Sequence, residues 1–363
     1  MKYHQIDQNL YIKNRAKFVA SMKPNSVAVF NSNDNYPVSA DTTLPFAQHR
    51  DILYLSGVDQ EESILVLYPD AALPANREIL FVKETSELIK IWEGDKLTKE
   101  KAFEVSGVKN VKWLQDFDLT LQYMAFEADT FYLGHNEHKK TLTSEMLTQQ
   151  DRMIVKCKEK YPLHNYRRAA KITRELRQIK SEEEIALMQQ AANISVGGFK
   201  RVLKAVKPEM MEYELEAELT YELIRNGAKR HAFMPIVASG ANACALHYNT
   251  NDSICKDGDM ILMDFGVCYA NYNSDTTRCF PVNGKFSKRQ KEVYNAVLRV
   301  KNEATKMLTP GTLWKQYHVE VGKIMTTELL GLDLLDKADV QNENPEWPAY
   351  KKYFMHGTSQ HMG

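Results

Sequence analysis

The hydrophobic pattern of the first half of the chain predicts an α/β domain. Short apolar runs that end in turn residues or charges are typical of β-strands. Such runs lie at residues 26–30, 51–57, 63–68, 78–82 and 130–134. Between them, residues 97–107 have a helical pattern closed by Gly107. Strands that alternate with helices predict one sheet with flanking helices.

The pattern of the second half predicts two long helices followed by strands. Ser181, with Glu184 three residues later, forms a capping box that starts a helix. Apolar residues then recur at helical spacing until Pro208. A second helix over 211–227 carries a stripe of leucines at every fourth position.

Length and composition indicate a globular protein of two domains. The 363 residues are 44% hydrophobic and 26% charged. We place the boundary in the charged stretch 164–184, which gives an N-terminal domain of residues 1–165 and a second domain of residues 166–363.

Charge and cysteine content limit the classes of binding partner and the cellular compartment that we expect. Lys and Arg number 47, as do Asp and Glu, so nothing favours nucleic acid or an anionic membrane as partner. No apolar run approaches the roughly 18 residues of a membrane span, and the start of the chain lacks the apolar core of a secretion signal. Five cysteines without a C-x-x-C pair predict reduced thiols, and hence a cytoplasmic protein.

The most informative stretch carries two aspartates. The run MILM at 260–263 predicts a strand buried on both faces, and it leads directly into Asp264. A carboxylate at the end of a buried strand needs a hydrogen bond, a counter-charge or a metal. Asp275 follows eleven residues later. Alternatively, Asp275 caps a turn and is neutralised by Arg278.

Hairpin geometry brings the two aspartates together. If the chain folds back between Tyr269 and Ala270, Asp264 and Asp275 lie opposite each other, with Cβ atoms roughly 4.5–5.5 Å apart. Two bare carboxylates at that distance repel, so a cation or a shared proton is implied. Two metal ions held between such carboxylates form a recurring hydrolytic device.

Histidines add further candidates. A short β-like run leads through Ser239 and Gly240 into small residues that deliver His247. A lone histidine is more often structural than catalytic. The chain then closes on MHGTSQHMG, in which His356 and His361 stand five positions apart.

Taken together, these segments resemble a known family. They are LRQIKSEEEIALMQQAANIS, IVASGANACALHYNTND, MDFGVCYANYNSDTTRCFPVNGKFS and MHGTSQHMG, in this order. With them the chain resembles the pita-bread metallopeptidases and, among these, aminopeptidase P, the Xaa-Pro aminopeptidases. Residues 39–70 and 91–97 are similar to that family's N-terminal domain. The resemblance implies an α/β N-terminal domain, a sheet with flanking helices, followed by an α+β pita-bread catalytic domain.

The resemblance also implies roles for single residues. Asp264 and Asp275 match the metal-binding aspartates, the second of which bridges both ions. His247 matches a histidine near the substrate that helps polarise the scissile carbonyl or hold the leaving group, and His356 matches a second active-site histidine. Both are expected to stabilise the tetrahedral oxyanion.

Two residues of the N-terminal domain are weaker candidates for substrate binding. Asp41 and Trp92 match positions that approach an active site in the family, in some members that of a neighbouring subunit. The alternative for Trp92 is a place in the core.

One position departs from the family pattern. The family's metal-binding histidine comes four residues after the histidine of the HG pair, and here that register holds Gln360. His361 follows one place later, and on an extended segment a shift of one residue turns the side chain to the opposite face. Either a bulge directs His361 into the site or Gln360 offers its carbonyl oxygen; we expect His361 to be the ligand.

The activity implied is hydrolysis of the N-terminal residue from peptides with proline at position two. Two divalent ions, with manganese expected, would activate the attacking water as hydroxide. The alternatives are a prolidase of the same fold and a non-catalytic pita-bread binding protein; a creatinase-like enzyme lacks the aspartates retained here. Peptide substrates and a homodimer or homotetramer are the expected partners.

The family's remaining ligands define a further expectation. Two glutamates, one of them the general base, and a further histidine follow the histidine region in the family, whereas this chain ends at Gly363. We therefore expect a C-terminally truncated chain, an incomplete pita-bread domain and little peptidase activity of the 363 residues alone. Strong turnover of Ala-Pro peptides by this chain would overturn that expectation.

Overall fold

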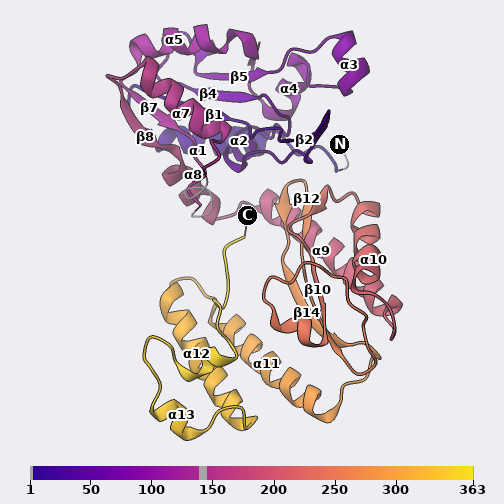
Figure 1. The fold of residues 1–363 in the computed structure, drawn as a ribbon. Coiled ribbons are helices and arrows are strands. Elements are labelled where there is room, and N and C mark those ends of the chain that lie inside the picture. The colour runs from indigo at the N-terminus through magenta and orange to yellow at the C-terminus, as the bar shows by residue number, and fades with distance from the viewer. Residues whose placement is uncertain (1–2, 139–144, 363) are drawn as a thin grey trace. The chain divides into compact units, whose positions relative to one another are not determined.

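The computed structural model describes residues 3–138 and 145–362 and divides into two compact units (Figure 1). The first unit runs from Tyr3 to Glu183, and the second begins at Glu184. The sequence prediction placed the boundary after residue 165. The structure assigns the next strand, β8 (Asn165–Arg168), to the first unit because it pairs in parallel with β7 (Thr130–Leu133).

The first unit is built on a mixed six-stranded sheet in the order β6–β5–β4–β1–β7–β8. Besides β7 and β8, its strands are β1 (Ser26–Asn31), β4 (Ile64–Leu67), β5 (Glu78–Val82) and β6 (Asn110–Trp113). Strand β4 is antiparallel to both β1 and β5, and the other neighbours are parallel. A separate two-stranded ribbon joins β2 (Pro37–Ser39) to β3 (Thr42–Thr43).

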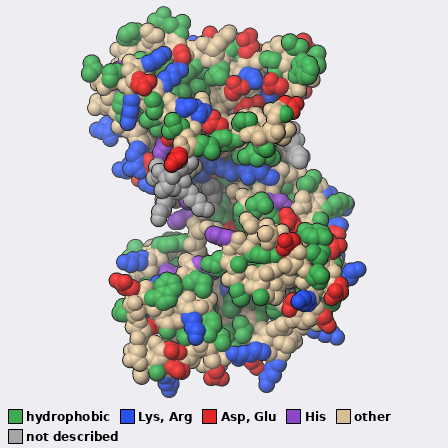
Figure 2. All heavy atoms as spheres, viewed as in Figure 1, with side chains coloured by type: hydrophobic (Ala, Val, Ile, Leu, Met, Phe, Trp, Pro, Cys, Tyr) green, Lys and Arg blue, Asp and Glu red, His purple; other side chains and the backbone are tan. Residues whose placement is uncertain are grey.

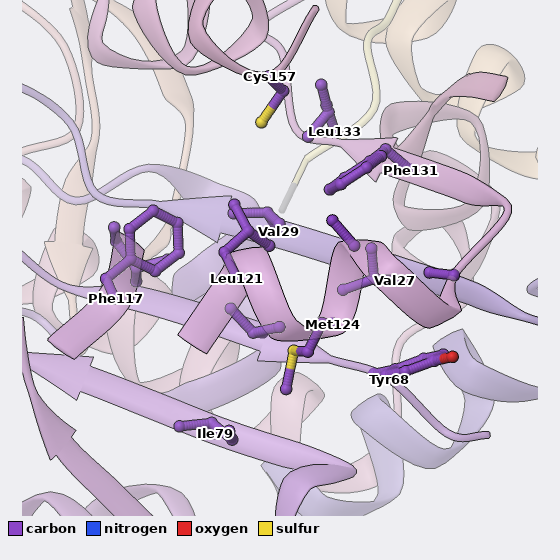
Figure 3. Packing of buried hydrophobic residues seen from close by; sticks show 14 of the residues in the cluster. Val27, Val29, Tyr68, Ile79, Phe117, Leu121, Met124, Phe131, Leu133 and Cys157 are labelled. Carbon is purple, nitrogen blue, oxygen red and sulfur yellow. The ribbon is translucent and has the colours of Figure 1, made fainter. Parts of the chain in front are cut away.

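Helices cover both faces of this sheet, because side chains of β1 alternate between two cores. Val27 and Val29 pack with α5 (Phe117–Glu127) and α7 (Gln149–Lys160), and Figure 3 shows Leu121 and Met124 of α5 over these strands. The opposite face is covered by α1 (Asn9–Ala20), α2 (Arg50–Ser56), α4 (Lys99–Ser106) and α8 (Ala169–Gln178). Helix α3 (Glu87–Glu93) and the 3-10 turns η1 (Pro74–Asn76) and η2 (Leu114–Asp116) complete the unit.

Four of the five strands predicted for this unit are confirmed, and one prediction was wrong. The strands expected within 26–30, 63–68, 78–82 and 130–134 are confirmed as β1, β4, β5 and β7. The run at 51–57, predicted as a strand, is helix α2. The His49 side chain accepts the Asp51 backbone N–H at its start, and Gly57, at φ 71°, ends it.

The second unit packs two helices against small antiparallel sheets. Helices α9 (Glu182–Ala205) and α10 (Glu212–Arg225) confirm the prediction, and the leucine stripe of α10 is buried. One sheet has the order β10 (Ile236–Ser239), β11 (Met260–Phe265), β14 (Thr276–Pro281). The other has the order β13 (Tyr272–Asn273), β12 (Val267–Tyr269), β9 (Arg230–His231).

Helices follow the sheets towards the end of the chain. They are α11 (Lys288–Met307), α12 (Trp314–Gly331) and α13 (Lys337–Gln341), with the 3-10 turns η3 (Gly240–Cys244) earlier and η4 (Ala349–Lys352) last. Within residues 3–138 and 145–362, no helix has the length and apolar content needed to cross a membrane. Side chains of both charges are scattered over the visible face of each unit (Figure 2).

Strand β11 is buried on one face only, which corrects the prediction of two buried faces. Ile261, Met263 and Phe265 pack against α9 and α10. Met260 and Leu262 are on the other face, where they line a groove of about 650 Å³ together with α11. Asp264 shares this second face because it follows the same alternation.

Candidate metal centre and active site

The register of the β11–β14 pair sets how the two aspartates meet. Asp264 lies opposite Thr277, two residues beyond Asp275, so the prediction that it lies opposite Asp275 was wrong. The chain folds back between Ala270 and Asn271, whose φ angles of 50° and 65° give the two-residue turn that suits a twisted hairpin. Asp275 is two residues from Thr277 and therefore faces the same side as Asp264.

Asp264 is the electrostatic centre of this site. Burial raises its pKa above the usual value, and the charge of Asp275 raises it further. The Thr277 hydroxyl lowers the pKa of Asp264, because it donates a hydrogen bond to Oδ1 at 2.9 Å. The charges of His247 and His356 also lower it. Asp275, His247 and His356 are therefore close enough to Asp264 to interact with its charge.

The two histidines sit at exposed positions. His247 lies in the loop between β10 and β11, and no hydrogen bond of its side chain occurs among the described residues. His356 Nδ1 lies 2.8 Å from the Gly357 carbonyl oxygen. Because a carbonyl only accepts, Nδ1 is the donor, and Nε2 is the atom left for another partner.

The end of the chain places Gln360, rather than His361, beside the aspartates. Gln360 Nε2 donates to Asp275 Oδ2 at 2.5 Å. His361 stacks on Trp314, with ring centroids 5.1 Å apart and planes inclined by 18°. Successive side chains of this extended segment point in opposite directions, and the expected re-aiming of His361 is not seen.

Helix α12 holds this final segment in a way that the sequence did not reveal. His318 Nδ1 is 2.7 Å from the Thr358 hydroxyl, and the Tyr317 hydroxyl is 3.2 Å from that of Ser359. The sequence signal that could have indicated this contact is the cluster of aromatic residues at the start of α12. Thr277 was also missed, although it stands in the quoted DTTR motif.

Asp41 and Trp92 both lie on the surface of the first unit. Asp41 is exposed in the turn that joins β2 to β3. Trp92, on α3, is 81% exposed, which excludes the alternative of a core residue. Their approach to an active site stays a prediction.

The donor set fits a hard divalent cation. Asp264 and Asp275 offer carboxylate oxygens, the ligand type preferred by magnesium, calcium and manganese. Over the described parts of the chain, no third His, Cys, Asp or Glu joins them in a group that could hold a metal ion. Water or other groups would have to complete the coordination.

Comparison with known proteins gives consistent matches for both units. Residues 186–363 match metallopeptidase family M24, and residues 11–132 match the N-terminal domain of aminopeptidase P. The Xaa-Pro aminopeptidase of Haemophilus influenzae is 33% identical over 96% of this chain and 78% of its own length. That of Escherichia coli is 31% identical over 99% of this chain and 81% of its own.

Solved structures agree with these sequence matches. Pseudomonas aeruginosa aminopeptidase PepP superposes with a TM-score of 0.84 at 30% identity, over 97% of this chain and 79% of that one. Zinc-substituted E. coli aminopeptidase P in complex with product gives 0.84 at 29% identity, over 98% and 80%. The similarity therefore extends across both units.

Proposed function

This chain belongs to metallopeptidase family M24 and carries the N-terminal domain of aminopeptidase P, and on that premise we propose that Asp264, Asp275, His247 and His356 form its catalytic centre. The protein is a metal-dependent aminopeptidase that removes the first residue from peptides with proline at position two. One observation carries the assignment of the site: the register of β11 and β14 puts Asp264 and Asp275 on the same face of the hairpin, with His247 and His356 near enough to act on Asp264.

Asp264 and Asp275 are the residues that would hold the metal ions. Their hard oxygen ligands suit manganese, which we propose as the physiological metal. Bound divalent ions would supply Lewis-acid activation of a water molecule at neutral pH. The chain's own contribution is to keep Asp264 oriented through the Thr277 hydroxyl and Asp275 through the Gln360 amide.

His247 and His356 would act on the substrate carbonyl. A donor aimed at the oxygen that gains charge in the transition state is usually a large catalytic term. His356 has Nε2 available for this, because Nδ1 is engaged by the Gly357 carbonyl. His247, on its exposed loop, can approach a peptide that lies over Asp264.

The remaining features follow from the family and the composition. We propose a cytoplasmic enzyme that works as a homodimer or homotetramer on peptide substrates. The contact between Gln360 and Asp275 favours one competing function, a non-catalytic binding protein, because a histidine is expected at that register. A prolidase differs in taking only dipeptides.

The test compares Ala-Pro-Ala with Ala-Ala-Ala, using the product of the entire reading frame freed of metal by a chelator. We expect release of alanine from Ala-Pro-Ala alone, restored by manganese and lost in Asp264→Asn. Peptide binding without hydrolysis in manganese would support the binding protein instead. Cleavage of Ala-Pro but not of the tripeptide would identify a prolidase.

A further inference from the structure

We propose that Glu212 is a positioning residue, whose buried carboxylate fixes the loop 240–252 that presents His247. The loop connects β10 to the segment before β11 and carries His247 near its middle. The inference rests on the proposed role of His247 in the reaction. Its structural part, the anchoring of the loop, stands independently of that role.

Five donors converge on the Glu212 carboxylate. Oε1 accepts the backbone N–H of Ser239 at 2.7 Å, the hydroxyl of the same residue at 2.8 Å, and the Asn242 amide at 3.2 Å. Oε2 accepts the Tyr248 hydroxyl at 2.6 Å and the backbone N–H of Ser253 at 3.1 Å. Glu212 is fully buried, so no water replaces these bonds.

The positions of these donors along the chain define what the carboxylate does. Ser239 is the last residue before the loop, and Ser253 is the first residue after it. Tyr248 is the neighbour of His247. One side chain therefore ties both ends of the loop and the residue adjacent to His247 to the start of helix α10.

His247 depends on this anchoring because its own side chain lacks a hydrogen bond within the described parts of the chain. Its location is set by the backbone on either side. A displacement of about 1 Å in a catalytic group can reduce a rate about a hundredfold. The fixed path of the loop is therefore a requirement for any action of His247 on a substrate.

The negative charge of Glu212 is essential to the arrangement. Burial opposes ionisation, yet hydrogen bonds from Tyr248, Ser239 and Ser253 hold its pKa below the usual value. Two of the donors are backbone N–H groups, one on each oxygen, and neither can reverse its direction. A glutamine would place its amide NH₂ against one of them, so it cannot replace the carboxylate.

A second carboxylate on the same face of α10 reinforces the anchoring. Glu216, one helical turn after Glu212, accepts the Asn251 amide at 2.8 Å. Asn251 in turn accepts the Val237 backbone N–H at 2.9 Å and has a positive φ of 48°. The end of the loop is thus fixed by helix and sheet together.

The test combines hydrogen exchange with a double-mutant cycle. Glu212→Gln is compared with Glu218→Gln, a substitution on the same helix α10 that removes an ion pair with Arg201 of α9 and does not touch the loop. We expect amides of 240–252 to exchange about tenfold faster in Glu212→Gln and unchanged in the control. Unchanged exchange in Glu212→Gln would overturn the anchoring.

Kinetics on Ala-Pro-Ala test the link to His247. We expect Glu212→Gln to lower kcat about ten- to a hundredfold with KM within about threefold, and to add less than about twofold in a His247→Ala background. An equal loss in both backgrounds would reduce Glu212 to a structural residue and overturn the proposal. If His247→Ala alone leaves kcat unchanged, the proposed role of His247 fails, while the exchange result still decides the anchoring.

A milder variant covers the case in which Glu212→Gln does not fold. Tyr248→Phe removes one of the five hydrogen bonds to Glu212, together with the bonds of its hydroxyl to Asn242, Asp252 and Ser253, and leaves the ring in place. We expect faster exchange at residues 245–250 and a loss of kcat of about three- to tenfold. Wild-type exchange and wild-type kcat in this variant would contradict the proposal.

Discussion

Gly266 joins the strand that carries Asp264 to the hairpin that leads to Asp275. A Cβ atom at this position would lie 2.2 Å from the Ser274 carbonyl oxygen and 2.9 Å from two further side-chain atoms. The φ angle of Gly266 lies outside the left-handed region, so the requirement for glycine is one of space alone. We therefore expect Gly266→Ala to displace the hairpin relative to the strand.

The size of the effect follows from the contacts. The Ser274 oxygen must move by about 0.8 Å to reach 3.0 Å, below which Cβ contacts essentially do not occur. Two hydrogen bonds of 2.9 Å between Val267 and Ser274 oppose that movement. Overpacking costs roughly 1–3 kcal/mol and a lost hydrogen bond about 1 kcal/mol, so we expect destabilisation of about 3 kcal/mol. That corresponds to a fall in Tm of about 6–12 °C.

Thermal and urea unfolding of Gly266→Ala measure this cost, and calorimetric titration with manganese measures the effect on the metal centre. Gly331→Ala in α12 is the matched control, because a Cβ there meets nothing within 4 Å and the helical site favours alanine by about 0.5–1 kcal/mol. We expect Gly266→Ala to weaken manganese binding about tenfold. A free energy of unfolding within about 0.5 kcal/mol of the parent protein would refute the steric argument.

Four further substitutions test the site and the fold. Asp264→Asn is expected to weaken manganese binding at least about a hundredfold, and unchanged affinity in calorimetry would remove Asp264 from the ligands. Gln360→Ala, which loses the bond to Asp275, should weaken manganese binding about tenfold and His361→Ala less than about twofold; the opposite order would restore His361 as the ligand. Burial lowers the pKa of His49 below 6.5, so its contribution to stability is complete above pH 6.5 and is lost as pH falls towards its folded pKa. His49→Asn keeps a capping side chain but has no titrating group, so its urea midpoint should change less between about pH 7.5 and 5 than that of the parent protein. A pH dependence of the midpoint parallel to that of the parent protein would contradict this.

Sequence reasoning succeeded where local chemistry decides the outcome. Strands β1, β4, β5 and β7 follow from short apolar runs, and α10 follows from its leucine stripe. Asp264 was visible because a carboxylate directly after an apolar strand is costly unless something compensates it. These signals require no knowledge of partners distant in the chain.

The errors came from features that local patterns leave undetermined. Residues 51–57 are apolar on several sides because helix α2 packs between α1, α4 and the sheet, and a short apolar run alone cannot distinguish that from a strand. The turn was placed one residue too early, and the pairing was therefore two residues off, because the alternation fixes the face of Asp264 and Asp275 but not the turn between them. Glu212 was missed because its five donors come from residues 27–41 positions later.

The two-residue turn at Ala270 and Asn271 has a consequence for how this gene can vary. Because both φ angles are positive, substitutions there are restricted to residues that reach this conformation at little cost, such as Gly, Asn and Asp. A codon inserted or deleted between Asp264 and Asp275 has a different effect, because one step of register sends Asp275 to the opposite face of the hairpin. Natural variation in this segment is therefore expected to consist of substitutions at constant length, so that the spacing of the two aspartates is inherited more strictly than the residues between them.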